Sequence, residues 1–369
     1  MKIVQLVPAM EQGGVERGVV EMNRAIVAQG WDNLVVAKNG RLLDQIERDG
    51  GRVARLDVKS KNPLTALWRA RELRKLLERE RPDVVNVHSR VPAWLFVIAN
   101  RKLRLPWISF AHGANSVSAY SKVMTFGTVT VTPSRYIADY LKAAYGLEEE
   151  KIRVIPRAID RDKFDPARLD REFMEEMKLK WRTEGRKVVM GVGRITQLKG
   201  YDTLIRATAI LKKSMPSIRT VIVGEAEALR KDVEEGLKAL VRELGLEDTV
   251  VFAGNQQKVA ECLSLADVVV SANTKKPEAF GRSMAEALAM NKPVVATAFG
   301  GALDIVENGK NGMLVPVESA GPEGFAQAIK TVLETEYGDL RTPAIEKFSF
   351  ANMIKKGLET YESLVLGKV

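Results

Sequence analysis

The sequence contains one cysteine, Cys262, and only two histidines among 369 residues. A single thiol cannot form an intramolecular disulfide, and it cannot supply the ligands of a cysteine-based zinc site. A disulfide-stabilised scaffold and a cysteine zinc module are therefore both excluded. We expect Cys262 to be a small core residue of a protein that resides in a reducing compartment.

Long apolar runs are also absent. No run reaches the roughly 18 residues that a membrane-spanning helix requires. The apolar run at residues 1–7 is interrupted by Pro8 and is too short for a secretory signal peptide. We predict that it forms a buried first strand. We therefore expect a cytoplasmic location, with peripheral contact to the inner face of the cytoplasmic membrane as an alternative.

Positive charge is abundant but unevenly distributed. The formal net charge is +10, and residues 1–155 carry 25 basic and 16 acidic residues, a net charge of +9. Residues 156–369 carry 32 and 31, a net charge of +1. This excess indicates that the first half meets an anionic partner such as phosphate, lipid head groups or nucleic acid. Aromatic residues make up only 6% and are not interleaved with the basic ones, which disfavours base stacking.

Short runs rich in valine and isoleucine alternate with longer amphipathic segments, which is typical of parallel sheets built from βαβ units. A single core stops growing near roughly 250–300 residues, so two domains are expected. The alternation pauses in a charged stretch before residue 187. We predict an α/β protein with two Rossmann-like domains, residues 1–160 and 187–349, joined by a linker at 161–186. The helix at 350–369 is expected to rejoin the first domain, and the two sheets to face each other across a cleft, where ligands of such folds bind.

Two loops after predicted strands carry residues suited to anions. Gly13 and Gly14 follow the first strand and open a helix, so backbone N–H groups there could meet a phosphate. Arg194 and Lys199 lie in a glycine-bounded loop after another strand, where two cations could bind a diphosphate. The alternatives are an ordinary turn and two solvated charges. Neither loop spells a dinucleotide-binding or Walker A motif.

A third motif contains two glutamates eight residues apart, Glu278 and Glu286. If a helix begins near Gly281, both carboxylates face one cleft and suit the hydroxyls of a sugar. The free N–H groups at the start of that helix would then point at a ligand phosphate. These N–H groups belong to Phe280, Gly281, Arg282 and Ser283. The alternative is a pair of surface glutamates.

The two histidines each follow a predicted buried strand, at the carboxyl edge of the first sheet. His112, before Gly113, is the stronger candidate for hydrogen bonding a sugar hydroxyl or stabilising developing charge. His88 is as well explained by a structural role. Asp160-Arg161-Asp162 spells a D-x-D sequence, but it lies at the predicted linker, so we interpret it as a turn and predict no metal site.

Together these motifs resemble those of family 4 glycosyltransferases of the GT-B fold, over nearly the whole chain. The residues that carry the likeness are Gly13-Gly14, His112-Gly113, Ile155-Pro156 with Asp160, Gly193-Arg194 with Lys199-Gly200, Glu278 with Glu286, and Gly300-Gly301 followed by residues 312–316. The resemblance implies a hexosyltransferase-type enzyme that uses a nucleoside-diphosphate sugar, retains anomeric configuration and needs neither metal nor another cofactor. Such enzymes have no agreed protein nucleophile, and the donor phosphate is thought to assist deprotonation.

The same resemblance implies roles for individual residues. Arg194 and Lys199 would bind the diphosphate, Glu278 the donor-sugar hydroxyls and Glu286 the ribose. The backbone from Phe280 to Ser283 would hold phosphate and sugar, residues 254–259 would flank the base, and Gly13-Gly14 would close on the phosphates. His112 and Glu278 are the predicted catalytic residues.

A closer resemblance, to bacterial enzymes that build lipopolysaccharide core or related surface glycans, is carried by residues 14–17, 89–94, Tyr120-Ser121 and 277–282. It implies that the acceptor, a glycan or a glycolipid, lies near His88, Ser89, Arg90 and Trp94. The chain departs from the family at residues 224–227, where Gly-x-Gly-Pro is common, and at Arg157-Ala158, where Asn-Gly is common. The arginine could add a cation near the cleft.

Two other functions are compatible with the same sequence features. The same fold could serve a sugar-nucleotide epimerase or hydrolase, and the net charge could serve a non-enzymatic binder of an anionic polymer. No nucleic-acid motif is present. A basic segment with an apolar stripe could lie on anionic lipid or could be a core-facing helix with a solvated face. The apolar residues of this segment are Leu64, Leu67, Trp68, Leu73, Leu76 and Leu77, and its basic residues are Arg69, Arg71, Arg74, Lys75, Arg79 and Arg81. A second basic cluster follows at Arg101, Lys102 and Arg104.

Overall fold

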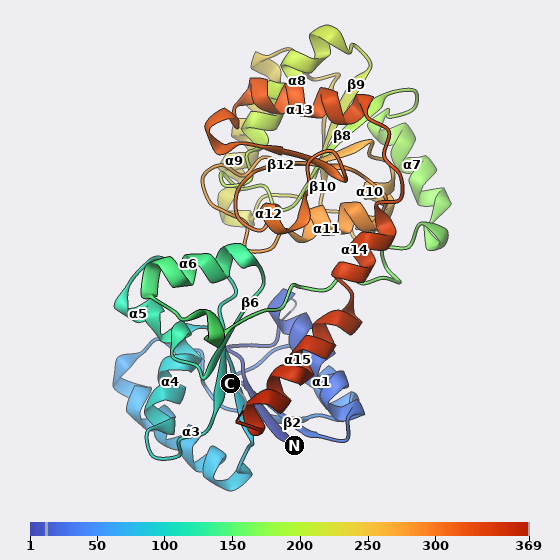
Figure 1. The fold of residues 1–369 in the computed structure, drawn as a ribbon. Helices are drawn as coiled ribbons and strands as arrows, with labels where there is room; N and C mark the ends of the chain where they lie inside the picture. Colours follow the sequence, from blue (N-terminus) through green and yellow to red (C-terminus); the bar gives the residue numbers. More distant parts are fainter. Residues whose placement is uncertain (12–13, 368–369) are drawn as a thin grey trace. The chain divides into compact units, whose positions relative to one another are not determined.

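The computed structural model describes residues 1–11 and 14–367 (Figure 1). The chain divides into two compact units, one formed by residues 1–158 with 350–369 and the other by residues 159–349. The division after residue 158 lies close to the predicted domain end at residue 160. The prediction of two Rossmann-like α/β domains is confirmed by the two sheets described below.

The first unit is built on a parallel sheet of seven strands in its described part, in the order β3-β2-β1-β4-β5-β6-β7. Central strands such as β4 are buried along their whole length, which explains why valines occupy both faces of β4 and why its polar residues, Asn86 and His88, are buried as well. The strands are β1 (Lys2–Leu6), β2 (Asp32–Ala37), β3 (Arg52–Arg55), β4 (Val84–His88), β5 (Trp107–Phe110), β6 (Val129–Thr132) and β7 (Ile152–Val154).

Helices cover both faces of this sheet. In Figure 1, α3, α4 and α6 lie on one face, and α1 and α15 lie together on the other. The helices are α1 (Gly14–Ala28), α2 (Leu43–Arg48), α3 (Ala66–Glu80), α4 (Arg90–Asn100), α5 (Ala119–Lys122), α6 (Arg135–Tyr145) and α15 (Phe350–Val365), with short 3-10 turns η1 (Pro63–Thr65), η2 (Val123–Thr125) and η3 (Glu149–Lys151).

The C-terminal helix α15 belongs to the first unit, as predicted. Tyr361 on this helix is fully buried, and its hydroxyl accepts a hydrogen bond from the side-chain amide of Asn86 on β4. Burial of the ring raises the pKa of the Tyr361 hydroxyl. This contact anchors the last helix to the centre of a sheet formed some 275 residues earlier in the chain.

The second unit is built on a parallel sheet of six strands in its described part, in the order β10-β9-β8-β11-β12-β13. The strands are β8 (Lys187–Val192), β9 (Ile218–Val223), β10 (Val250–Gly254), β11 (Val268–Ser271), β12 (Val294–Thr297) and β13 (Gly312–Val315). The helices are α7 (Arg171–Trp181), α8 (Tyr201–Ser214), α9 (Lys231–Glu243), α10 (Val259–Ser264), α11 (Arg282–Ala289), α12 (Ala302–Ile305), α13 (Pro322–Glu334) and α14 (Arg341–Lys347), with 3-10 turns η4 (Pro166–Arg168), η5 (Ala228–Arg230) and η6 (Val317–Ser319).

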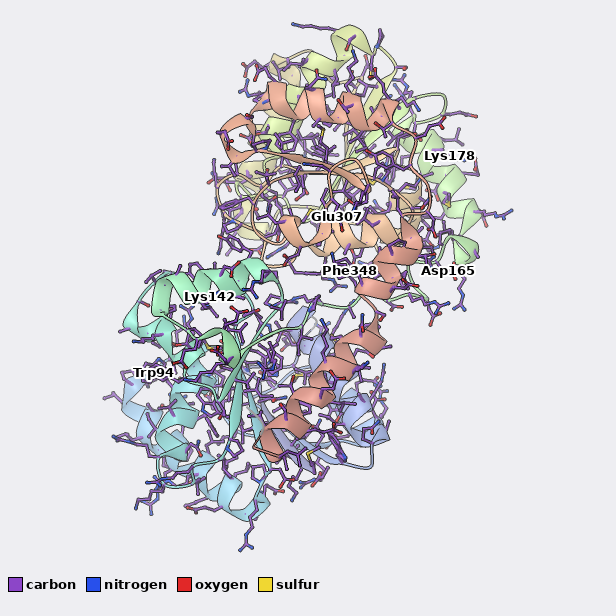
Figure 2. All side chains as sticks on the ribbon, viewed as in Figure 1. Trp94, Lys142, Asp165, Lys178, Glu307 and Phe348 are labelled. Carbon is purple, nitrogen blue, oxygen red and sulfur yellow. The ribbon has the colours of Figure 1, made fainter. Side chains whose placement is uncertain are left out.

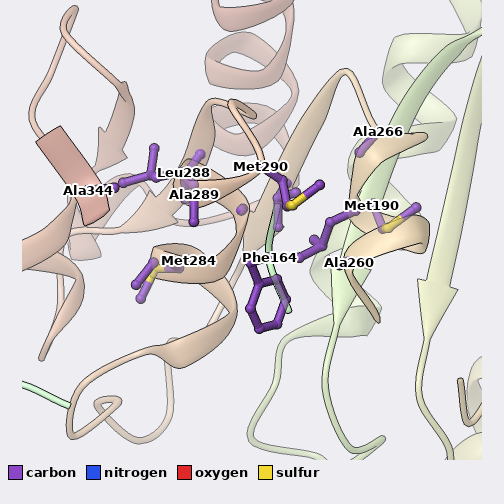
Figure 3. Packing of buried hydrophobic residues seen from close by; sticks show 14 of the residues in the cluster. Phe164, Met190, Ala260, Ala266, Met284, Leu288, Ala289, Met290 and Ala344 are labelled. Atoms are coloured by element: carbon purple, nitrogen blue, oxygen red, sulfur yellow. The ribbon is translucent and has the colours of Figure 1, made fainter. Parts of the chain in front are cut away.

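The prediction of a separate linker at residues 161–186 is wrong, because these residues belong to the second unit. Phe164, Met177 and Trp181 are buried in the core of the second unit, and α7 packs against α10. Figure 3 shows Phe164 in this cluster, near Met290. The segment looks like a linker in sequence because its exposed positions are highly charged, and three widely spaced apolar residues do the packing.

None of the helices in the described ranges combines the length and apolar character that crossing a bilayer would require.

Candidate functional site

In the second unit, a glycine-bounded loop after β8 brings Lys199 to the carboxyl edge of the sheet. The hydroxyl of Tyr201 donates a hydrogen bond to the carbonyl of Gly193 at 2.9 Å and ties the start of α8 to the end of β8. Burial raises the pKa of Tyr201, with the charge of Glu278 as a second cause, so this hydroxyl stays protonated as a donor. The loop that carries Lys199 is thus held from both ends.

The loop that carries Glu278 is also held in place, by the turn after β12. The backbone of Glu278 pairs with that of Gly300, and its carbonyl accepts a hydrogen bond from Gly301 N–H at 2.7 Å. A Cβ at position 301 would lie 2.2 Å from the carbonyl oxygen of Phe280, so only glycine fits there. This contact explains why Gly300-Gly301 accompanies the two-glutamate motif in the sequence.

These two loops bring Lys199 and Glu278 into direct contact. The ammonium of Lys199 donates to Oε1 of Glu278, and the amide of Asn273 donates to the same oxygen at 3.0 Å. Asn273 was not among the predicted site residues, although its position just after β11, at the carboxyl edge of the sheet, is a signal that could have identified it. Its own carbonyl oxygen is buried and, in the described part of the chain, accepts no hydrogen bond. The three side chains form a polar cluster that is only partly exposed.

Helix α11 begins at Arg282, as predicted, and Gly281 precedes it with φ of 99°. This left-handed backbone conformation is strained for a residue with a Cβ, so it favours glycine at position 281. The first N–H groups of a helix have no acceptor in the helix itself, so those after Gly281 are available to an anion. Ser283 lies in this first turn and is half-buried.

The side chains around the start of α11 are less free than the sequence suggests. Phe280 is buried edge-on against Phe348, with ring centroids 5.3 Å apart, so only its backbone could meet a ligand. Figure 2 labels Phe348. Glu286 is almost entirely buried, and its carboxylate accepts a hydrogen bond from Arg282 at 3.1 Å. Glu278 and Glu286 therefore have different partners, and the ribose-binding role of Glu286 stays a prediction.

Arg194 lines a cavity of about 420 Å³ in the second unit, together with residues 224–228 and Asn255, Gln256 and Val259. Its largely exposed guanidinium pairs with Glu227, one of the residues at which the chain departs from the family pattern. The predicted pair of diphosphate-binding cations is thus split between two acidic partners, since Lys199 pairs with Glu278. The cavity includes part of the segment 254–259 that we predicted to flank the base.

In the first unit, the structure brings the two histidines into contact. His88 ends β4 and His112 follows β5, and Nδ1 of His88 lies 3.1 Å from Nε2 of His112. The rings are stacked at 5.3 Å between centroids, and Phe110 stacks on His88 at 4.4 Å. A hydrogen bond between two ring nitrogens needs one donor and one acceptor. At least one of the two rings must therefore be a neutral imidazole, because an imidazolium has no acceptor nitrogen.

The environment keeps both histidines neutral. Burial lowers the pKa of His88 to about 3, with the positive charge of Arg157 as a second cause. Burial, the neighbouring His88 and Arg157 together hold the pKa of His112 well below its ordinary range. His88, His112, Arg157 and Gly14 all line one cavity of about 80 Å³. Arg157 therefore places a cation at this cavity, and Gly13 lies outside the described residues.

This pair makes the stability of the fold depend on pH. Histidine in an unfolded chain titrates near about 6.5, so below that pH the unfolded state binds protons that the folded state excludes. The contribution of His88 to the free energy of unfolding should stay constant above about pH 6.5. It should then fall by up to about 1.4 kcal/mol per pH unit as the pH is lowered from about 6.5 toward 3. Chemical denaturation at a series of pH values, compared with His88→Asn, measures this loss.

Proton NMR of the native protein provides a second readout, for which no variant is needed. The chain has two histidines, and because both are expected to stay neutral, their two Cε1–H signals can be followed together without individual assignment. Signals that titrate with a midpoint near about 6.5 would contradict the neutral pair.

The predicted acceptor residues form a separate cluster on the first unit. Arg90 donates to the hydroxyl of Ser121 at 3.1 Å and lies 5.3 Å from the ring centroid of Tyr120. The indole N–H of Trp94 donates to the carbonyl of Tyr120 at 2.9 Å, and Trp94 is labelled in Figure 2. The structure thus joins Arg90 and Trp94 to Tyr120-Ser121. Ser89 stands before α4 with φ of 93°, and His88 belongs to the histidine pair instead.

Two further expectations from the sequence are confirmed. The carboxylate of Asp160 accepts the N–H of Lys163 at 3.0 Å, so the D-x-D sequence is a turn. Cys262 is fully buried, and burial raises the pKa of its thiol to about 12. Among the described residues, histidine, cysteine, aspartate and glutamate side chains do not gather in any group of three or more that could hold a metal ion.

The sequence matches the models of two protein families, one in each half of the chain. The family described as Glycosyltransferase Family 4 matches residues 12–163, and the one described as Glycosyl transferases group 1 matches residues 173–347. Each match falls almost wholly on one of the two structural units. The chain is 27% identical over 332 residues to an uncharacterised glycosyltransferase of Methanocaldococcus jannaschii, covering 80% of each chain.

A solved structure and a further relative point the same way. A glycosyltransferase from Rickettsia africae has a similar structure, with a TM-score of 0.87 and 28% identity over 99% of this chain and 98% of its own. The lipopolysaccharide core biosynthesis glycosyltransferase LpsE of Rhizobium meliloti is 33% identical over 160 residues. That likeness covers 43% of this chain and 43% of LpsE, less than half the length of either.

Proposed function

Because the chain belongs to the glycosyltransferases of the GT-B fold, with a family 4 domain followed by a group 1 domain, we propose that it transfers a sugar from a nucleoside-diphosphate sugar to a glycan or glycolipid. We further propose that the reaction retains anomeric configuration and proceeds without a metal ion. The observation that carries the proposal is the contact between Lys199 and Glu278, at loops held by glycines beside the free N-terminus of α11.

The second unit would bind the donor. Lys199 and the first N–H groups of α11 offer positive charge and donors for a diphosphate, which is the role that a metal ion has in other transferases. Glu278 would accept hydrogen bonds from hydroxyls of the sugar. The cavity of about 420 Å³ beside Arg194 has room for the nucleoside, where Arg194 would exchange its contact with Glu227 for a phosphate oxygen.

In the proposed reaction, an acceptor hydroxyl attacks the anomeric carbon while the bond from that carbon to the diphosphate oxygen breaks. The electron pair of that bond leaves with the nucleoside diphosphate, and the hydroxyl proton passes to a phosphate oxygen on the same face of the sugar. Neutral His112 would hydrogen bond the sugar as positive charge develops on the ring. A neutral imidazole suits this position because an imidazolium would repel that charge.

We propose a lipopolysaccharide-core or related surface glycan as the acceptor class. The partial likeness to LpsE supports this, as does the net charge of +9 on residues 1–155, which suits a phosphorylated acceptor. The cluster of Arg90, Trp94 and Tyr120 offers an aromatic surface and a cation for such a glycan.

A thermal-shift screen of UDP-, GDP- and ADP-sugars tests the proposal directly. One donor should raise the apparent stability by about 2.7 kcal/mol at a concentration of 100 times its Kd. Adding a matching glycan acceptor should then release the nucleoside diphosphate, with unchanged rate in the presence of a chelator. The anomeric coupling in the product NMR spectrum should match that of the donor.

Three results would contradict the proposal. If no sugar nucleotide shifts the melting temperature, the donor site is wrong. Turnover of the donor without acceptor would favour an epimerase or hydrolase on the same fold. Salt-sensitive binding of an anionic polymer, without affinity for any sugar nucleotide, would favour the non-enzymatic interpretation.

A further inference from the structure

The 3-10 turn η1 and the first turn of helix α3, which follows it directly, display three large apolar side chains to solvent. Leu64 in η1 is 91% exposed, and Leu67 and Trp68 in α3 are 73% and 62% exposed. Leu64 precedes the other two by three and four residues, the spacing of neighbours on one side of a helical segment. Single exposed apolar residues are common on proteins, but a group of three large ones on one helix face marks an interaction surface.

The remaining apolar residues of α3 have a different role. Leu73 and Leu77 are buried, and α3 packs beside α4 on the sheet. The apolar stripe expected from the sequence is therefore divided: its C-terminal part faces the core and its N-terminal part faces solvent. Packing among residues 1–11 and 14–367 explains the first part and leaves the second exposed.

The loop that presents these side chains is held rigidly by a buried arginine. The guanidinium of Arg69 donates to the carbonyl of Asn62 at 2.9 Å, to that of Asp57 at 3.3 Å and to the hydroxyl of Thr65 at 3.1 Å. The side chain of Asn62 accepts the N–H of Leu64 at 3.0 Å. The exposed apolar group is therefore built into the fold, and little conformational freedom would be lost when it binds.

Three cations flank the apolar group in sequence. Lys59 and Lys61 precede it and Arg71 follows it one turn later, and all three are exposed. In the described ranges of the chain, none of the three pairs with a carboxylate, whereas Lys75 further along pairs with Glu72. Asp57, the acidic residue nearest to Lys59 and Lys61 in sequence, is already bound by Lys38 at 2.9 Å. Exposed apolar side chains flanked in sequence by unpaired cations complement an anionic surface with an apolar interior.

We propose that this surface, defined as Lys59, Lys61, Leu64, Leu67, Trp68 and Arg71, binds the interface of an anionic lipid bilayer. Leucine and tryptophan would enter the boundary between head groups and acyl chains, where indole rings are favoured. The lysines and the arginine would bind lipid phosphates. The contact is peripheral and independent of the donor site.

Co-sedimentation of the full chain with vesicles tests this proposal. Vesicles of phosphatidylcholine with about one third phosphatidylglycerol should bind the protein, and pure phosphatidylcholine vesicles should bind it far more weakly. The combined variant Leu64→Ser, Leu67→Ser and Trp68→Ser should weaken partitioning by about a hundredfold. The variant Lys59→Glu, Lys61→Glu and Arg71→Glu should produce a loss of about the same size that diminishes as salt is raised.

Leu179 offers a matched control. It is 73% exposed, like Leu67, and lies on α7 between Lys178 and Lys180, but no other large apolar side chain of α7 is exposed. Leu179→Ser should leave vesicle binding unchanged. Tryptophan fluorescence should shift to the blue on binding in the native protein and much less in Trp68→Phe.

Several outcomes would overturn the proposal. Vesicle binding that survives the apolar variant, or that ignores anionic lipid content, would remove its basis. Loss of a concentration-dependent dimer in the apolar variant, with no vesicle binding by the native chain, would assign the surface to a second copy. The sugar-nucleotide thermal shift, measured on the same preparations, separates failure of this surface from failure of the proposed function.

Discussion

Replacing Lys199 with alanine should lower kcat/KM for sugar transfer by about 10²–10³-fold, the size of effect seen when one donor to a developing oxyanion is removed. Lys199 contacts Glu278, which precedes the first residue of α11 by four positions, and Asn273 donates to the same carboxylate oxygen. When the donor binds, its ammonium would turn from Glu278 to the diphosphate. Because that charge grows as the nucleoside diphosphate leaves, the loss should fall mainly on kcat.

Glu278→Ala should be about as damaging, since it removes the acceptor for the sugar hydroxyls and leaves Lys199 without its partner. The two residues are also coupled in stability. Each single variant leaves a partly buried charge unpaired, so the double variant should cost less stability than the sum of the two, by about 1 kcal/mol. Activity should not recover in the double variant. Steady-state kinetics and chemical denaturation of the four proteins provide both measurements.

Lys310→Ala is the matched control for Lys199→Ala. Lys310 also pairs with a glutamate of the second unit, Glu307, at 2.8 Å, but both side chains are exposed. Such surface pairs contribute about 0–1 kcal/mol and should not affect transfer. If Lys199→Ala and Lys310→Ala had equal activity, or if both site variants failed to fold, the site would have to be reassigned to a structural role.

His112→Ala should lower kcat by about 10²-fold with a smaller change in KM, because the predicted hydrogen bond strengthens as charge develops on the sugar. His88→Asn should have a weaker effect on kcat, since His88 would act by positioning the ring of His112 through their 3.1 Å contact. The neutral state of the pair adds a second readout: native kcat should show no titration near pH 6.5 that belongs to either histidine.

Kinetics of the two histidine variants against pH separate these roles. Suppose that kcat of the native enzyme falls as the pH rises, with a midpoint near about 6.5, and that kcat of neither variant does so. That result would show that a protonated histidine is needed, and it would contradict the proposed neutral role. Equal losses in both variants, with altered stability, would indicate that the pair serves packing alone.

Much of the site was predictable because it depends on local signals. The start of α11 at Arg282 follows from a glycine before an apolar-faced helix, and the position of His88 and His112 at strand ends follows from the apolar runs before them. In parallel strands these ends share one edge, so their proximity could be expected. Their direct contact, and the neutral state that burial imposes on them, could not.

The failures share one cause. The charged surface of residues 161–186 indicated a linker, because the partners of Trp181 and Phe164 are distant in sequence. The pairing of Arg194 with Glu227, 33 residues away in the chain, was not foreseen, and the phosphate contact of Arg194 stays a prediction. Asn273 went unnoticed because only the fold brings it to Glu278.

The alternation of strands and helices and the glycine-bounded loops could be predicted from the order of the residues, because periodicity and turn chemistry act over a few neighbouring residues. The charges that pair, the contact between the two histidines and the leucines of η1 and α3 that remain in solvent follow from the tertiary structure. These features depend on side chains that are far apart in the chain and meet only when the sheets and their helices have packed.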